Sequence, residues 1–144
     1  MLSIAEDWYP DEGEDAALNQ ICVISQDCEL DDGTTESFST HLLQVEDCSV
    51  VLSHVTITQY IIVKDGARLT IEECVFLPKY RTHAAAIDVM DNSELIVKNS
   101  HLFNQDGITL RAEIISRCTL QNVVFAGTNH IALMITSNSI ATVS

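Results

Sequence analysis

The chain has 144 residues, of which 47% are hydrophobic and 19% are charged, and this composition is typical of one globular domain with a sizeable core. The formal net charge of −14 disfavours binding to nucleic acid or to an anionic membrane, because both require a basic surface. No apolar run approaches the roughly 18 residues of a membrane-spanning helix, and the N-terminus lacks the basic and apolar regions of a signal peptide, so we expect an intracellular, cytoplasmic protein.

The N-terminal segment, residues 1–40, differs from the rest of the chain in its charge. Residues 1–63 contain 13 Asp and Glu and no Lys or Arg. Residues 22–30 have the apolar pattern of a candidate first coil, whereas residues 31–40 are typical of a polar loop. We therefore expect residues 1–40 to form an acidic cap or tail with a candidate first coil, and residues 41–144 to form the main domain.

The main domain repeats a pattern of apolar residues with offsets of 0, +2, +5 and +7. The four copies are Val50, Leu52, Val55 and Ile57; Leu69, Ile71, Cys74 and Phe76; Leu95, Val97, Ser100 and Leu102; and Cys118, Leu120, Val123 and Phe125. The copies start 19, 26 and 23 residues apart, and Ser100 is their one polar member. An offset of two is the periodicity of a β-strand, so each copy predicts two short strands that face the same interior.

The step of three residues in the middle of each copy predicts a bend. The bend residues are His54, Glu73, Asn99 and Asn122. Asn tolerates the left-handed backbone conformation that such a bend requires. A further apolar strand precedes each copy, at residues 42–45, 60–63, 86–89 and 107–110. Each unit is therefore a strand, a turn, a strand, a bend and a strand.

Three short strands in every 19 to 26 residues are typical of a right-handed parallel β-helix, a solenoid whose coils stack at about 4.8 Å. We predict an all-β protein with about five such coils. The alternative is an antiparallel sandwich of short strands. A sandwich explains the alternation of apolar residues, but it does not explain the constant step of three residues.

Two stretches of the repeat resemble the coils of a known superfamily. They are VKDGARLTIEECVF (residues 63–76) and VMDNSELIVKNSHLF (residues 89–103), and they resemble the right-handed β-helix of the pectin-lyase-like superfamily. They are most similar to its non-enzymatic eukaryotic branch, the family with the C-terminal β-helix of SHC SH2-domain-binding protein and Nessun dorma. The resemblance covers about residues 41–125, and the N-terminal helical region of that family is missing here. It implies a binding or scaffold role with protein or carbohydrate ligands.

Two aspartates are candidate metal ligands. Asp65 and Asp91 each lie two residues after a predicted strand, so they should stack on adjacent coils about 4.8 Å apart. Two carboxylates at that distance repel each other unless a cation joins them, and Ca²⁺ takes oxygen ligands of this kind. The alternative is a turn role, because Asp-Gly and Asp-Asn pairs are turn formers. We therefore treat Asp65 and Asp91 as a candidate calcium site and expect no other cofactor.

The longest connection between copies is a candidate binding site. Residues 78–86 concentrate Lys79, Tyr80, Arg81 and His83. Long loops on a solenoid commonly carry recognition, and Tyr and Arg are frequent anchors of interfaces. We predict that these four side chains contact a protein or glycan partner, although a plain surface loop is the alternative.

A catalytic centre of the glycosidase type requires two carboxylates across a groove. Glu72 with Glu94, or Asp88 with Asp91, are candidate pairs, but solvent-facing charges that alternate with Lys and Arg explain these residues as well. The chain has neither the G-H-G nor the R-I-K motif that polygalacturonases of the resembled superfamily share. We assign no catalytic residue, and a small or degenerate carbohydrate-active enzyme is the alternative function.

The C-terminal segment, residues 128–144, contains no Asp, Glu, Lys or Arg and is rich in β-forming residues. An uncharged sheet edge of this kind associates with other edges. We therefore expect a homo-oligomer that forms through residues 128–144. The sequence as a whole predicts a non-catalytic β-helix module that binds a protein or glycan and self-associates.

Overall fold

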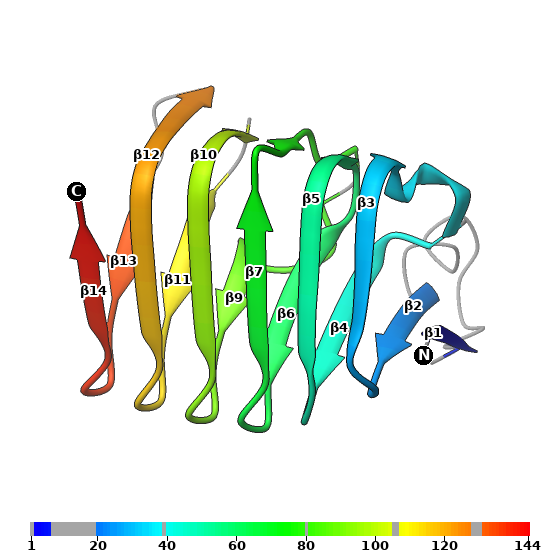
Figure 1. Ribbon diagram of the computed structural model, residues 1–144. Coiled ribbons are helices and arrows are strands. Elements are labelled where there is room, and N and C mark those ends of the chain that lie inside the picture. The colour runs from blue at the N-terminus through cyan, green and yellow to red at the C-terminus, as the bar shows by residue number, and fades with distance from the viewer. Residues whose placement is uncertain (1, 7–19, 39, 80, 105–106, 128–130) are drawn as a thin grey trace.

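The computed structural model describes residues 2–6, 20–38, 40–79, 81–104, 107–127 and 131–144. These residues form a parallel β-solenoid of about five coils, so the predicted all-β, parallel β-helix architecture is confirmed. Two sheets, called sheet A and sheet B below, enclose one core, and the coils follow one another from the N-terminus to the C-terminus (Figure 1). No helix among the described residues is long and apolar enough to cross a membrane.

Sheet A has the strand order β1, β2, β4, β6, β9, β11 and β13. Its strands are β1 (Leu2–Glu6), β2 (Gln20–Ile24), β4 (Leu42–Glu46), β6 (Tyr60–Lys64), β9 (Ala85–Val89), β11 (Ile108–Ala112) and β13 (Leu133–Ile135). Sheet B has the order β14, β12, β10, β7, β5 and β3, and the short β8 pairs with β5 and β10. Its strands are β3 (Cys28–Thr34), β5 (Ser49–Ile57), β7 (Arg68–Glu72), β8 (Val75–Phe76), β10 (Glu94–Asn104), β12 (Arg117–Gly127) and β14 (Ile140–Val143).

The repeated apolar residues superpose from coil to coil and form the core. Parallel pairing places Leu69 of β7 beside Val50 of β5 and Leu95 of β10, and all three are at most 1% exposed. Ser100, the polar member of the repeat, is buried as well, and its hydroxyl accepts a hydrogen bond from the Cys74 N–H at 3.0 Å. The buried hydroxyl is therefore paired, as a polar group in a core must be. The offsets of the repeat mark the inward-facing positions.

The bend residues adopt the left-handed conformation that the step of three residues predicts. The angle φ is 56° at His54, 52° at Glu73, 51° at Asn99 and 54° at Asn122. In β5, β10 and β12 the bend lies inside one long strand, which arches over the core, so the two short strands of the prediction merge there (Figure 1). The Asn122 amide Nδ2 donates to Oδ1 of Asn99 at 2.9 Å, which ties adjacent bends together.

A second left-handed feature joins sheet A to sheet B. Two consecutive residues have positive φ at Asp65–Gly66, Asp91–Asn92, Ile114–Ile115 and Ser137–Asn138. The turns stack directly, because the Gly66 N–H donates to the Asp91 carbonyl at 2.9 Å and the Asn92 N–H donates to the Ile114 carbonyl at 3.0 Å. Gly, Asn and Asp adopt this conformation at low cost, whereas a β-branched residue in it is a genuine outlier. The turn at Ile114–Ile115 is therefore strained.

The N-terminal segment takes part in the solenoid. β2 and β3 pair in parallel with β4 and β5, so the candidate coil at residues 22–30 lies in the stack. β1 pairs antiparallel with the outer edge of β2. The polar loop predicted for residues 31–40 is wrong in part, because pairing with β5 extends β3 to Thr34 and a 3₁₀ helix follows at Thr35–Phe38. Most of the predicted acidic cap, residues 7–19, lies outside the described part of the chain.

The double substitution Ile114→Asn with Ile115→Gly should stabilise the protein. Asn and Gly adopt the left-handed conformation of this turn at low cost, whereas two isoleucines do not. We expect the free energy of unfolding in urea to rise by about 1 to 2 kcal/mol. The matched control places Ile at both Asp91 and Asn92 in the equivalent turn and should lower it by a similar amount. Equal stability of all three proteins would contradict the strain at this turn.

Candidate functional site

The loop between β8 and β9, residues 77–84, leaves the stack of coils. In the preceding coil a connection of only two residues joins β5 to β6. The loop begins in register with that connection, since the Leu77 N–H donates to the Ile57 carbonyl at 2.7 Å and the Lys79 N–H donates to the Thr58 carbonyl at 3.0 Å. Beyond Lys79 the loop has more residues than one level of the stack can accommodate, so it protrudes.

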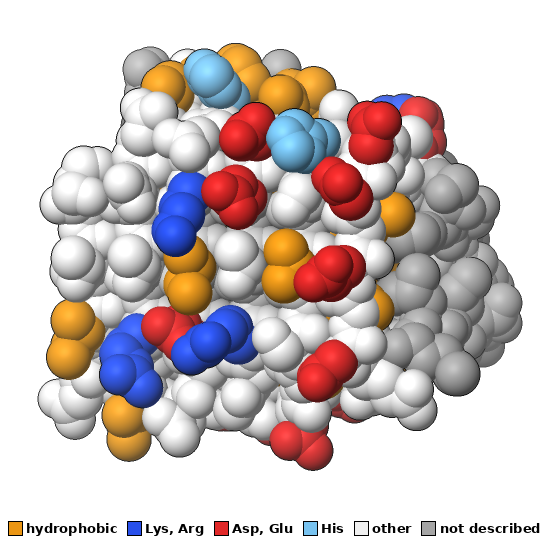
Figure 2. All heavy atoms as spheres, in the orientation of Figure 1, with side chains coloured by type: hydrophobic (Ala, Val, Ile, Leu, Met, Phe, Trp, Pro, Cys, Tyr) orange, Lys and Arg blue, Asp and Glu red, His pale blue; other side chains and the backbone are white. Residues whose placement is uncertain are grey.

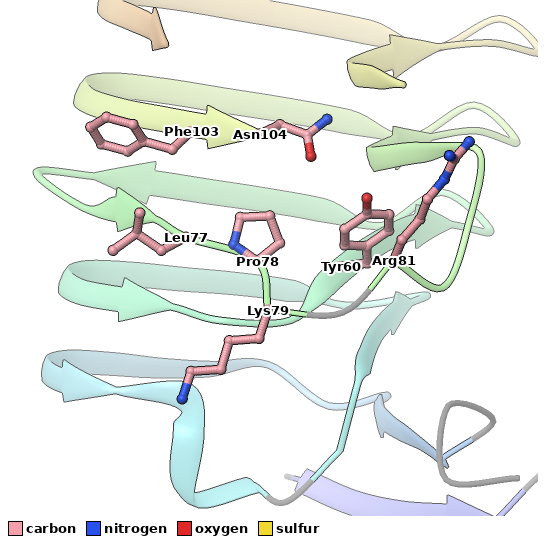
Figure 3. A pocket seen from close by; sticks show the side chains of 7 residues that line it. All are labelled: Tyr60, Leu77, Pro78, Lys79, Arg81, Phe103 and Asn104. Carbon is pink, nitrogen blue, oxygen red and sulfur yellow. The ribbon is translucent and has the colours of Figure 1, made fainter. Parts of the chain in front are cut away.

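The protruding loop opens a pocket of about 350 Å³. The pocket is lined by Tyr60 of β6, by Leu77, Pro78, Lys79 and Arg81 of the loop, and by Phe103 and Asn104 of β10. Leu77 and Pro78 lie on one level of the stack, with Phe103 and Asn104 on the next, and Tyr60 and Arg81 stand toward sheet A (Figure 3). This volume is at the lower end of those of ligand sites, and it suits a small ligand or a few side chains of a partner.

Two of the described residues that line the pocket are charged, Lys79 and Arg81. Both are cations, and both are among the contact residues that the sequence predicts. Lys79 forms an ion pair with Glu36, and both side chains are about half exposed, so solvent screens the pair. The Arg81 side chain crosses to the next coil, where its guanidinium lies beside Gly107; a Cβ at that glycine would come within 3.3 Å of it. Tyr80, the third predicted contact residue, lies outside the described residues.

His83, the fourth predicted contact residue, does not line the pocket but joins the far end of the loop to sheet A. Its Nε2 lies 2.7 Å from Oδ2 of Asp88 in β9. Arg111 of β11 donates two hydrogen bonds to the same carboxylate, from Nη2 to Oδ2 at 2.6 Å and from Nε to Oδ1 at 3.3 Å. The Arg111 Nε also lies 3.1 Å from Oε2 of Glu113. These four residues are called the Asp88 cluster below.

Asp88 is a buried charge on the outer side of sheet A. Its side chain is 0% exposed and every residue of β9 is buried, and His83 of the loop and Arg111 of β11 both contact the Asp88 carboxylate. Burial raises the pKa of the Asp88 carboxyl, but hydrogen bonds with His83, Arg111 and Glu113 outweigh burial and lower that pKa from 3.8 to about 2. The interpretation of Asp88 as a solvent-facing charge is therefore wrong. The carboxylate faces outward, yet it fastens the loop to the sheet.

The same contacts shift the pKa of the Glu113 carboxyl in the opposite direction. Burial raises the pKa of its carboxyl, and a hydrogen bond with Asp88 and repulsion from the Asp88 charge raise that pKa further. Two neighbouring carboxyls with pKa values displaced in opposite directions are an arrangement that general acid catalysis uses. Here the ionised member, Asp88, is fully buried and out of reach of a ligand.

Asp65 and Asp91 occupy equivalent positions in adjacent turns, as the sequence predicts. Their φ angles are 56° and 57°, so the left-handed turn accounts for both residues. Within the described ranges, no group of three or more His, Cys, Asp and Glu side chains is arranged to hold a metal ion. The calcium site at Asp65 and Asp91 stays a prediction.

On the outer face of sheet B, acidic and basic side chains lie close together where β7, β10 and β12 pair, whereas the side of the face toward β3 carries acidic side chains without Lys or Arg (Figure 2). Arg68 Nη2 lies 2.9 Å from Oε1 of Glu94, and parallel pairing places Lys98 beside Glu72. Glu72 and Glu94, a candidate acid pair in the sequence, thus each lie beside a base. Exposed pairs of this kind add little to stability, but charges on a sheet face discourage nonspecific association.

The bend of β5 carries a histidine between two acids. His54 Nδ1 lies 2.9 Å from Oδ1 of Asp31, and its Nε2 lies 2.9 Å from Oε2 of Glu73. The hydrogen bonds with Asp31 and Glu73 raise the pKa of His54. The three side chains are more than half exposed, so this contact lies in solvent at the edge of the sheet B face and encloses no site.

The last coil leaves core positions open. Val143 pairs with Leu120 in register, yet Val143 is 63% exposed whereas Leu120 is 1% exposed. Ile140 is also largely exposed, but it pairs with the exposed Arg117 and so lies on the outer side of sheet B. We use the name C-terminal face for the apolar surface formed by Leu133, Ile135 and Val143, whose partners in the preceding coil are buried. Exposed apolar surface of this kind is a common feature of association sites.

Sequence reasoning found the loop and its two cations but missed the other walls of the pocket. Phe103 and Asn104 belong to the next coil. The feature of the sequence that could have indicated them is the spacing of 26 residues between the copies that start at Leu69 and Leu95. The longest spacing marks the level where the loop leaves the stack. The pairing of Asp88 with Arg111 also had a signal, because the two residues are one coil apart in register.

Comparison of the chain with protein-family models, with curated proteins and with solved structures finds no match. The class of the protein is therefore defined by its fold, a parallel β-solenoid. Its candidate functional site is the pocket beside the loop of residues 77–84.

Lowering the pH should remove the contribution of Asp88 to stability. A depressed carboxyl pKa stabilises the folded state above the unfolded value of 3.8, and this stabilisation is lost as the pH falls through about 2. The difference between the unfolded and folded pKa values of Asp88 corresponds to about 2 kcal/mol of unfolding free energy. In urea unfolding, the stability difference between the wild-type protein and Asp88→Asn should therefore be largest above about pH 5 and shrink between about pH 4 and pH 2.

Asp65→Asn is the matched control, because it removes one carboxylate from an exposed turn in which Asn is equally well accommodated. Its stability should stay close to that of the wild-type protein. A wild-type advantage over Asp88→Asn that persists unchanged at pH 2 would contradict the role of the ionised Asp88 carboxylate.

Proposed function

We propose that the chain is a non-catalytic β-solenoid module that binds a protein or glycan partner at the loop of residues 77–84. The observation that carries this proposal is the pocket beside Lys79 and Arg81, where the connection between β8 and β9 is longer than the two-residue connection of the preceding coil. The Asp88 cluster holds the loop on sheet A before any partner arrives. Less conformational entropy is then lost on association, which favours binding.

A rigid scaffold with one diverted loop supports recognition as the role of that loop. Solenoids commonly bind partners through loops and surfaces that their repeats position. We include membership of the non-enzymatic branch of the pectin-lyase-like superfamily in the proposal, supported by the parallel coils and by the repeat of residues 63–76 and 89–103. The net charge of −14 supports a partner other than nucleic acid or an anionic membrane.

The five free cysteines support an intracellular, cytoplasmic location, which is also part of the proposal. Thiols persist in a reducing compartment, whereas secreted domains of this size commonly use paired cysteines. Cys22, Cys74 and Cys118 are buried in the core, and burial raises the pKa of the Cys118 thiol to about 12. These thiols act as small apolar core residues.

A small or degenerate carbohydrate-active enzyme is the second candidate function. The observation that favours it is the raised pKa of Glu113 beside the ionised Asp88, since a raised carboxyl pKa is a property of general acids in enzymes of this kind. The burial of Asp88 disfavours it, because the second carboxylate of a catalytic pair must reach the substrate or a water beside it. We therefore place the binding function first.

Self-association through residues 128–144 is the other part of the proposal. The support for it is the C-terminal face, where Leu133, Ile135 and Val143 continue rows that are buried in earlier coils. Residues 118–144 contain no Asp, Glu, Lys or Arg, so two such faces can meet without charge repulsion in a chain of net charge −14. Burial of these side chains against a second copy would remove apolar surface from water.

Replacing Lys79 and Arg81 together by Ala should weaken binding of a partner by about tenfold or more, because charge-assisted contacts at the centre of an interface carry much of its affinity. The partner is first identified with the wild-type protein, by pull-down with mass spectrometry and by a glycan array. Titration calorimetry then compares the variants. Arg68→Ala with Arg117→Ala removes the same charge from sheet B and should leave the affinity unchanged; equal losses in both variants would exclude the loop as the site.

Replacing Leu133 and Val143 together by Asp should produce a monomer, because burial of unpaired carboxylates in an interface is costly. The wild-type protein should sediment as an oligomer whose mass falls on dilution. Val51→Asp on the outer side of sheet B is the matched control and should leave the oligomer intact. A wild-type protein that stays monomeric at high concentration in sedimentation velocity would refute this part of the proposal.

A further inference from the structure

We infer that the pocket beside the loop takes an extended, acidic segment of a protein partner. The inference rests on the binding function proposed above and names the chemistry of the ligand. Three features of the described residues carry it: the connection that leaves the stack, the apolar walls of the pocket and the two cations at its rim.

The level at which the loop leaves the stack suits an extended peptide. β8 pairs with β10 as far as Phe76 and Leu102, and pairing in sheet A begins at Ile61 of β6 and Ile87 of β9. A connection that stayed within the stack between these points would run as an extended backbone. The described part of the loop instead returns beside Gly107 of the next coil, and the pocket of about 350 Å³ lies where it departs. A pocket of this volume accommodates a few residues of an extended peptide.

The walls of the pocket offer apolar contacts to alternate side chains of such a peptide. Leu77 is 44% exposed, although the preceding Phe76 is fully buried. Pro78 and Phe103 complete this side of the pocket (Figure 3). The Phe103 ring is held by stacking on His101, with ring centroids 6.3 Å apart. An apolar side chain that covers Leu77 would be removed from water at little cost in side-chain ordering.

The rim of the pocket favours a carboxylate. The net charge of −14 opposes a polyanion at long range, but salt screens that repulsion, so one or two carboxylates can bind next to the local cations. Lys79 and Arg81 are two of only 7 Lys and Arg in the chain, and none of the described lining residues is acidic. A guanidinium binds a carboxylate through two parallel hydrogen bonds, which gives Arg81 both strength and directionality. A ligand carboxylate can replace Glu36 at Lys79 with little loss, because that ion pair is exposed.

A glycan fits the same surface less well. The apolar face of a sugar ring stacks on an accessible aromatic face. Tyr60 is only 3% exposed, so its ring offers no such face, and Phe103 is then the one aromatic ring among the described walls on which a sugar could stack. The described walls are Leu and Pro rather than a set of aromatic planes, and they favour aliphatic side chains of a peptide.

A phage-displayed library of short random peptides, panned on the full-length protein, tests the inference. The library is first depleted on the Lys79→Glu, Arg81→Glu variant. We expect the recovered peptides to contain Asp or Glu next to Leu, Ile or Val. A synthetic recovered peptide should bind Arg81→Ala about tenfold or more weakly in fluorescence anisotropy, and its Asn or Gln analogue should lose as much affinity for the wild-type protein. The two losses should not add, because both remove the same contact.

Two further variants make the result specific to this pocket. Leu77→Trp fills the space without changing any charge and should block the peptide. Arg68→Ala removes one cation from sheet B and should leave the affinity unchanged. Circular dichroism and thermal unfolding verify that each variant retains the fold.

The outcomes separate this inference from the function on which it rests. The acidic ligand is overturned if the recovered peptides lack acidic residues, or if acidic peptides bind Arg81→Ala with unchanged affinity. If Leu77→Trp nevertheless blocks these peptides, the loop remains a binding site. Glycan ligands that are lost on Lys79→Ala with Arg81→Ala, in the absence of any peptide ligand, overturn the peptide but leave the proposed function in place. If no peptide binds but the pull-down captures a protein that Lys79→Ala with Arg81→Ala releases, the inference fails and the proposed function stands; if peptides, glycans and the pull-down all give no partner, both fail together.

Discussion

Parallel hydrogen bonding between successive coils is the constraint on which the rest of this structure depends. Each coil must follow the path of its neighbour so that backbone N–H and C=O groups meet at every level. The path turns sharply at the bend and at the connection between the sheets, and both places require left-handed residues. Once the backbone paths of adjacent coils coincide, their inward-facing side chains lie above one another and pack into one hydrophobic core.

The same constraint explains where the molecule departs from favourable local chemistry. Ile114 and Ile115 stay in a left-handed turn because the turns on either side, at Asp91–Asn92 and Ser137–Asn138, hydrogen-bond to them. Local preference alone would give these isoleucines an extended conformation. The hydrogen bonds of the stack therefore stabilise a conformation that the residues themselves disfavour.

The candidate site lies where the connection between β8 and β9 leaves the stack of coils. The two ends of the loop have different roles. Lys79 and Arg81 border the space that the excursion opens, while His83 anchors the returning chain to the sheet. The anchor tolerates the burial of Asp88 because Arg111 and His83 both contact its carboxylate, and a buried charge without such partners would destabilise the fold strongly.

The sequence by itself determined the solenoid, its inward rows and the bends, because strand periodicity and the left-handed preference of residues such as Asn122 are local properties. It also indicated the loop through its length and its cations. Only the tertiary structure decided that Phe103 would line the same pocket as Leu77, and that Asp88 would be buried and paired with Arg111. These contacts join residues about one coil apart in sequence, and whether they meet depends on the register of the stack and on the path of the diverted loop.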